Sequence, residues 1–138
     1  MSAEYFLFLI VVLFVLLFVI ATLYAYWLYK KHLNDYKIFF KQYRQSGLYI
    51  DSVSNVSSNF GFVLYYLKIA FFVRLLQDKK MYIEKGKLVD KECYEYMHNL
   101  PSEQTAWMWS WRRAHITQAF LFIISLMLGY LHSILYHY

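Results

Sequence analysis

Hydrophobic residues dominate both ends of the chain, and polar residues gather between them. From Tyr5 to Tyr29 the only polar side chain that is not aromatic is Thr22. As a helix this stretch would be about 37 Å long, more than the ~30 Å hydrocarbon core of a bilayer. It is too long for the core of a cleaved signal peptide, and no basic residue precedes it. The pattern predicts a membrane-spanning anchor over residues 5–29.

A second apolar stretch covers residues 114–136, with an uncharged centre over 119–131. Pro101, Ser102 and Glu103 have the pattern of a helix start, so we expect one helix from about Ser102 to Tyr136. Aromatic and basic residues precede the apolar part, where indole rings and cations favour the membrane interface. We therefore expect five residues at the interface: Trp107, Trp109, Trp111, Arg112 and Arg113.

The segment between the two spans, residues 30–113, is basic. It holds all 14 Lys and Arg residues and every acidic residue except Glu4. Basic residues close to the spans favour the cytoplasmic side. The predicted topology therefore has a cytoplasmic loop and both termini in the periplasm. The predicted fold class is an all-α membrane protein with two transmembrane helices, joined by a helical, basic and partly interfacial segment.

Within this segment, apolar positions recur every three or four residues after the first span, which predicts that its helix continues to Gly47. Residues 51–59 have the composition of a turn-rich connector. Residues 60–76 are apolar but contain Lys68 and Arg74. A helix at the interface, with both cations reaching for lipid headgroups, is favoured over a third span or a buried helix.

Residues 77–95 are charged and mixed in sign. The favoured interpretation is a solvated turn followed by one short helix after Val89. The alternative is a surface that docks onto anionic lipid, because basic residues near such a surface add to its binding.

Candidate chemistry is sparse. The single Cys93 excludes a disulfide within one chain, and the Glu95–His98 spacing of di-iron sites occurs once where two copies are needed. His115 and His132 raise the possibility of haem ligation, for which two copies of the chain would be required. Structural roles are favoured for both. We therefore predict no catalytic residue, cofactor, metal, nucleic acid or small-molecule substrate.

Small residues recur at four-residue steps in both spans. Lipid gives no hydrophobic drive for helix association, so small residues that allow close backbone approach are typical of packed membrane helices. The two ridges lie at different membrane depths in an antiparallel pair, so one of them is available to a second copy of the chain. The helix-packing candidates are Ser125, Gly129 and Ser133 in the second span, and Ala21 and Ala25 in the first.

The layout resembles the universal stress protein B family of small two-span bacterial inner-membrane proteins. The likeness is carried by YKKHLNDYKIFFKQYRQ after the first span, by VLYYLKIAFFVRLL, and by WRRAHITQAFLFIISL at the second span. The charged region over 78–95 and the three tryptophans depart from the family pattern. The resemblance implies an inner-membrane protein connected with general stress, and no site residue is carried over from the family.

Three classes of function remain. The first is a non-enzymatic inner-membrane protein that acts by contact with the lipid bilayer, a membrane-protein partner or a second copy of itself. The second is an accessory subunit of a larger membrane complex of the respiratory type, with His115 or His132 near a cofactor. The third is a membrane-active toxin, a holin-like protein or its immunity protein.

Overall fold

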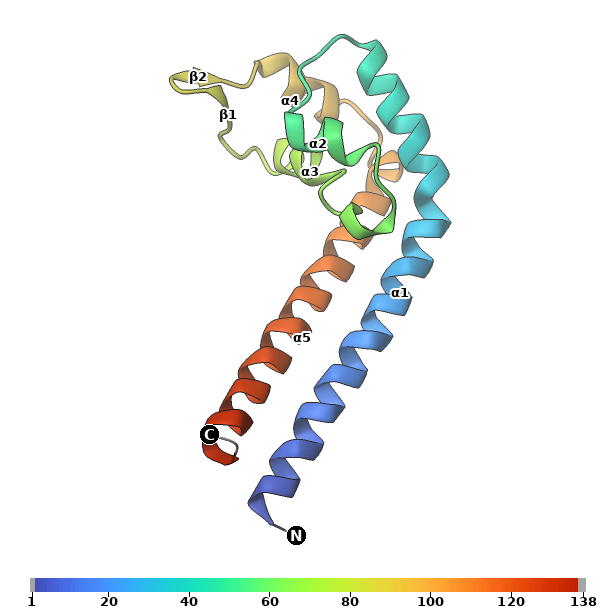
Figure 1. The fold of residues 1–138 in the computed structure, drawn as a ribbon. Coiled ribbons are helices and arrows are strands. Elements are labelled where there is room, and N and C mark those ends of the chain that lie inside the picture. The colour runs from blue at the N-terminus through green and yellow to red at the C-terminus, as the bar shows by residue number, and fades with distance from the viewer. Residues whose placement is uncertain (1, 137–138) are drawn as a thin grey trace. The chain divides into compact units, whose positions relative to one another are not determined.

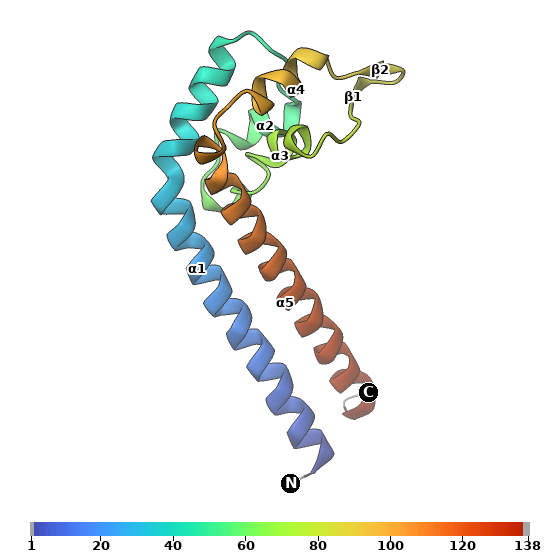
Figure 2. The same ribbon diagram turned by 180° about the vertical axis from the view of Figure 1, so that it is seen from behind.

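The computed structural model describes residues 2–136, which form two compact units. The chain is mostly helical, and its two long helices are α1 (Ala3–Gln45) and α5 (Ala106–Tyr136). The first unit contains residues 2–27 and 113–136, and the second unit is Leu28–Arg112. Figures 1 and 2 show the elements from opposite sides.

The first unit is an antiparallel pair made from the beginning of α1 and most of α5. The amide of Gln118 donates a hydrogen bond to the hydroxyl of Thr22 at 3.0 Å. Further along, the rings of Phe8 and His132 lie 6.1 Å apart. Residue numbers rise on one helix as they fall on the other, so the start of α1 and the end of α5 meet at one end of the pair (Figure 1).

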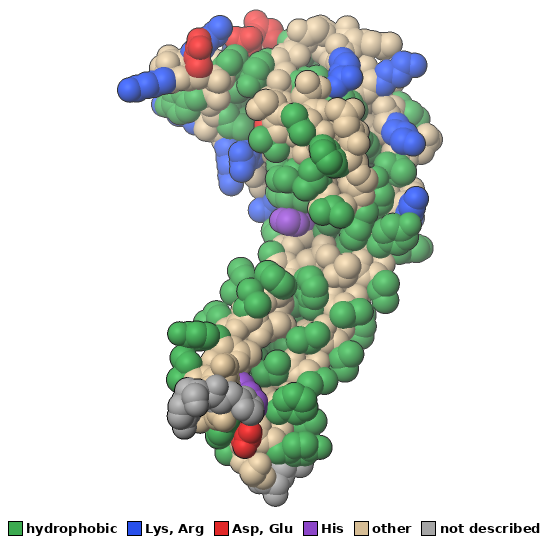
Figure 3. Space-filling model, in the orientation of Figure 1, with side chains coloured by type: hydrophobic (Ala, Val, Ile, Leu, Met, Phe, Trp, Pro, Cys, Tyr) green, Lys and Arg blue, Asp and Glu red, His purple; other side chains and the backbone are tan. Residues whose placement is uncertain are grey.

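Both long helices are apolar enough, over a sufficient length, to cross a membrane, as the sequence predicts. The most apolar 18-residue stretch of each helix has no buried residue. Large side chains such as Leu23, Phe120 and Met127 are more than half exposed. Hydrophobic side chains cover the visible face of this unit in Figure 3. An apolar surface of this extent is typical of a membrane or protein contact, because a soluble monomer would leave it against water.

Helix α1 continues well past its apolar part and ends where the sequence predicts. Gly47 follows the last turn with a φ of +75°, a left-handed conformation that glycine adopts without steric cost. Its N–H bonds to the carbonyl of Arg44 at 3.2 Å. The helix therefore ends by a glycine cap.

The second unit combines the end of α1 and the start of α5 with several short elements. Its strands β1 and β2 pair antiparallel, Tyr82 with Leu88 and Glu84 with Lys87. Gly86 turns between them with a φ of +81°. The expectation of an all-α fold is therefore wrong in this one place. The short elements are α2 (Ser52–Ser57), η1 (Phe62–Leu64), α3 (Ala70–Leu76), β1 (Tyr82–Glu84), β2 (Lys87–Leu88), α4 (Lys91–His98) and η2 (Ser102–Gln104).

Several local predictions can be compared with these elements. The short helix expected after Val89 is present as α4. The expected connector over 51–59 instead contains α2, because the carboxylate of Asp51 caps it by accepting the N–H of Ser54 at 3.1 Å. The expected helix over 60–76 is divided into η1, turns and α3. The expected start at Ser102 is the 3-10 turn η2, and α5 begins at Ala106.

Candidate functional site

Aromatic side chains build the core of the second unit. The part of α1 that follows its apolar run places Tyr36, Phe40 and Tyr43 on one buried stripe. The ring of Phe72 from α3 lies 4.9 Å from that of Tyr43 in an edge-to-face arrangement, and both residues are fully buried. Aromatic pairs of this kind add to the free energy gained by burial. The core fixes the backbone from which the surface side chains project.

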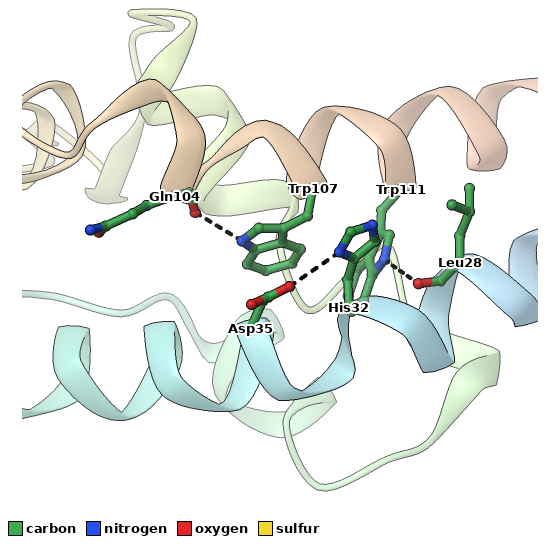
Figure 4. A network of polar contacts seen from close by, with 6 residues as sticks. All are labelled: Leu28, His32, Asp35, Gln104, Trp107 and Trp111. Atoms are coloured by element: carbon green, nitrogen blue, oxygen red, sulfur yellow. Dashed lines mark hydrogen bonds and ion pairs between the residues drawn. The ribbon is translucent and has the colours of Figure 1, made fainter.

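Two of the three tryptophans belong to this core, contrary to the expectation that all three face the membrane interface. Trp107 is 5% exposed and Trp111 is fully buried. In Figure 4, the indole N–H of Trp111 donates to the carbonyl of Leu28 at 3.2 Å. Trp107 and Trp111 share one helix face at a four-residue spacing. Trp109 lies on another face, is partly exposed, and has the Arg112 guanidinium 5.9 Å from its ring.

Lys68 is also part of the interior, which corrects the expectation that it reaches for headgroups. Its side chain is fully enclosed, with 2% of the residue exposed. The ammonium donates to the carbonyl of Ser57 at 2.7 Å and to that of Phe60. It also lies 5.4 Å from the centre of the Tyr36 ring. A buried cation needs such partners, because it has lost its water. Lys68 therefore ties the end of α2 to the core.

A basic groove lies beside this core on the outer side of α1. Its lining includes the exposed side chains of Lys37, Lys41 and Arg44, which follow one another at steps of four and three residues. The guanidinium of Arg44 lies 4.6 Å from the centre of the Phe40 ring and donates to the amide oxygen of Asn55 at 2.6 Å. The remaining lining residues are Tyr36, Phe40, Gln45, Ser58 and Asn59. No acidic side chain lines the groove, so it favours an anion.

Tyr36 brings a buried hydroxyl to the same groove. The residue is 4% exposed, and its hydroxyl oxygen has no hydrogen-bond partner among residues 2–136. Burial raises the pKa of this hydroxyl above its ordinary value, and the nearby charge of Arg44 opposes that rise. The hydroxyl therefore keeps its proton at neutral pH and is a donor without an acceptor among residues 2–136.

An apolar face adjoins the groove along the chain. It is formed by the exposed side chains of Val53, Val56, Phe60, Val63 and Leu67, and Val63 is 89% exposed. Figure 3 shows hydrophobic side chains gathered on this unit, with Lys and Arg side chains around them. Ser58 and Asn59, which line the groove, lie between members of this set. Exposed apolar side chains bordered by cations are typical of a surface that docks onto a membrane.

The other side of α1 carries a groove of opposite charge. It is lined by Asp35 and Glu103 together with His32, whose Nδ1 lies 3.1 Å from the Asp35 carboxylate. Figure 4 shows this pair beside Trp107, whose indole N–H donates to the carbonyl of Gln104 at 2.8 Å. The second unit thus separates its charges to two sides of one helix.

The small-residue ridges lie within the first unit. Ser125 and Gly129 are partly covered, whereas Ser133 is exposed, and Ala25 is completely buried. A methyl group added at Gly129 would meet no atom within 4 Å. The close backbone approach predicted at Gly129 is therefore not made to any other element among residues 2–136. Ala21 is partly covered, and pairing with a second copy stays a prediction.

The remaining candidate residues are the histidines and the arginines, and their neighbours indicate no catalytic or ligand-binding arrangement among residues 2–136. The ring of His132 is tilted against the rings of Phe8 and Tyr136, at 6.1 Å and 5.3 Å, and His115 is partly covered. His98 bonds to the carboxylate of Asp78 at 2.8 Å. Over residues 2–136 no group of three or more His, Cys, Asp or Glu side chains could hold a metal ion. Arg74 and Arg113 are exposed, Arg112 is partly exposed, and their expected position at a membrane interface stays a prediction.

Sequence periodicity does not reveal the groove, although it places Lys37, Lys41 and Arg44 between the apolar positions of one helix. The second wall of the groove comes from residues 58–59, and sequence spacing does not bring that wall to α1. Comparison with protein-family models, curated proteins and solved structures finds no match to this chain. The resemblance to the universal stress protein B family therefore stays a prediction, and function must be argued from the surfaces described above.

Proposed function

We propose that this protein is a non-enzymatic inner-membrane protein whose folded cytoplasmic unit acts at the membrane surface. The unburied apolar stretches of α1 and α5 support insertion of both helices. Basic residues immediately after the first span and before the second support a cytoplasmic position for Leu28–Arg112. The resemblance noted above adds general stress as the physiological setting.

The observation that carries the proposal is the exposed apolar face from Val53 to Leu67. Leaving Val63 and Phe60 against water costs free energy, since burial of a large apolar side chain is worth about 1.5–3 kcal/mol. Both ends of this unit continue into apolar helices, so a bilayer would be the nearest apolar phase. The cations of the adjoining groove, Lys37, Lys41 and Arg44, would attract the anionic headgroups of a cytoplasmic leaflet. We therefore assign this face a function as a contact surface for lipid.

Topology is tested by cysteine accessibility in intact cells, in a Cys93→Ala background. Single cysteines are placed at Ser2 and Tyr138 for the termini and at Lys85 for the exposed hairpin turn. An impermeant thiol reagent is expected to label the two terminal positions and to leave Lys85→Cys unlabelled until the cells are opened. Labelling of Lys85→Cys in intact cells would contradict the proposal.

The surface contact is tested by placing a photoreactive amino acid at Val63 in the full chain. The matched control is Tyr82 on the hairpin, which is also exposed. Lipid adducts at Val63 and none at Tyr82 are expected. A protein adduct at Val63 would favour the accessory-subunit alternative instead, and the absence of any Val63 adduct would contradict a role for this face.

A further inference from the structure

We infer that the basic groove of the second unit binds the phosphate of an anionic phospholipid, with Lys37, Lys41 and Arg44 supplying the charge and the Tyr36 hydroxyl supplying a buried hydrogen bond. This inference rests on the proposed function and extends it by naming a ligand class. It differs from general attraction to a charged surface, because it requires a defined site and one headgroup phosphate.

The first argument is charge and shape. Three cations converge on a groove of about 390 Å³, which lies in the ~300–1,000 Å³ range of small-molecule sites. Arg44 is held in place from two sides, by the ring of Phe40 and the amide of Asn55. A guanidinium fixed in this way has donors left for a phosphate, to which it binds with two parallel hydrogen bonds.

The second argument is the Tyr36 hydroxyl. Buried polar groups in folded proteins nearly always have a partner, and a group without one lowers stability. This hydroxyl has none among residues 2–136, although Tyr36 lines the same groove as Arg44. An anionic oxygen bound in the groove would provide the missing acceptor.

The third argument identifies the source of the phosphate as lipid. Ser58 and Asn59 line the groove and directly precede the exposed Phe60, so a ligand held there would have its anionic head near exposed hydrocarbon. On α1 itself the groove residues follow the apolar run after only a few helical turns. A phospholipid has both chemical parts, whereas a free phosphate ion has only one.

The experiment uses the full chain in nanodiscs that contain equal amounts of phosphatidylcholine and phosphatidylglycerol. Native mass spectrometry then measures which lipid each protein molecule retains. The wild-type chain is expected to retain phosphatidylglycerol preferentially. Lys37→Gln combined with Lys41→Gln should reduce this preference by ~30-fold. The matched control, Lys85→Gln with Lys87→Gln, makes the same change in net charge on the hairpin and should retain the preference.

Tyr36→Phe separates ligand binding from folding. If the hydroxyl binds phosphate, this variant loses selectivity by about tenfold while the buried thiol of Cys93 stays protected from maleimide, as in the wild type. Unchanged selectivity in Tyr36→Phe, or equal loss in the hairpin control, would overturn the inference. Release of phosphatidylglycerol by excess inorganic phosphate would also overturn it, in favour of a free-phosphate site. A lipid adduct at Val63 without headgroup selectivity would leave the proposed function intact and reject only this site.

Discussion

Lys68 offers the sharpest test of how the second unit is held together. We consider Lys68→Met, which keeps an unbranched side chain of similar length and removes only the ammonium. In the folded chain this ammonium donates to the carbonyls of Ser57 and Phe60 and lies over the Tyr36 ring. The substitution therefore leaves the Phe60 carbonyl without its donor and leaves the Ser57 carbonyl with the N–H of Phe60 alone.

The size of the effect follows from these contacts. The stranded Phe60 carbonyl costs about 1–3 kcal/mol, the hydrogen bond lost by Ser57 about 0.5–1.5 kcal/mol, and the lost cation–π contact about 0.5–2 kcal/mol. Against this, the variant no longer removes a charge from water, which offsets part of the loss. We expect a net loss of about 2–4 kcal/mol in the free energy of unfolding of the second unit.

Cys93 provides the assay, because it is the only cysteine and is fully buried. Its rate of reaction with a maleimide dye measures how often the second unit opens. A loss of 2–4 kcal/mol should raise this rate by ~30- to ~1,000-fold. Lys85→Met, on the exposed hairpin turn, is the control and should react as slowly as the wild type. A wild-type rate of dye reaction in Lys68→Met would refute the buried-cation reasoning and would favour a lysine at the lipid interface.

Three further predictions follow from packing and ionisation. Trp111→Ala should destabilise the second unit by about 3–5 kcal/mol, measured by the same dye reaction, whereas Trp109→Ala should cost less than about 1 kcal/mol; equal effects would contradict the difference in burial. Gly129→Leu should leave the reactivity of Cys93 unchanged and abolish a crosslinked dimer in membranes, and a dimer that persists would exclude this ridge as its interface. Alkaline pH should unfold the second unit, because tyrosines whose pKa is raised by burial stabilise the fold below pH 10 and lose that contribution as they ionise. Tyrosinate absorbance and the dye reaction of Cys93 follow this unfolding. Burial lowers the pKa of Lys68, which opposes this loss of stability only until the lysine of the unfolded chain has given up its proton. Normal tyrosine titration in the folded chain would contradict the prediction for Tyr36, Tyr43 and Tyr65.

Several features of this protein follow from sequence alone because they depend on local chemistry. The first apolar helix is determined by an unbroken run of hydrophobic residues, and its end is determined by Gly47, which can take a left-handed φ. The helix after Val89 is similarly local, since Asp90 holds the N-cap position with an extended backbone and the following residues favour a helix.

Tertiary structure alone decided which environment the ambiguous residues occupy. Trp107, Trp111 and Lys68 have side chains that suit either a membrane interface or a protein interior, since each joins a long apolar part to a polar end. Local sequence cannot choose between these environments. In the folded unit, the carbonyl of Gln104 accepts from Trp107 and that of Leu28 accepts from Trp111. The carbonyls of Ser57 and Phe60 accept from Lys68, and the surrounding rings cover the apolar parts.

The candidate site also depends on packing between distant segments. The sequence places Lys37, Lys41 and Arg44 on one face of a helix, but a row of cations is only an exposed polar face until another segment forms a second wall. That wall exists because α2 and the following turn pack against α1, with Asn55 bonded to Arg44 and Lys68 holding the end of α2. A groove is a property of two surfaces, so the periodicity of one helix determines the charges and only the fold determines the cavity between them.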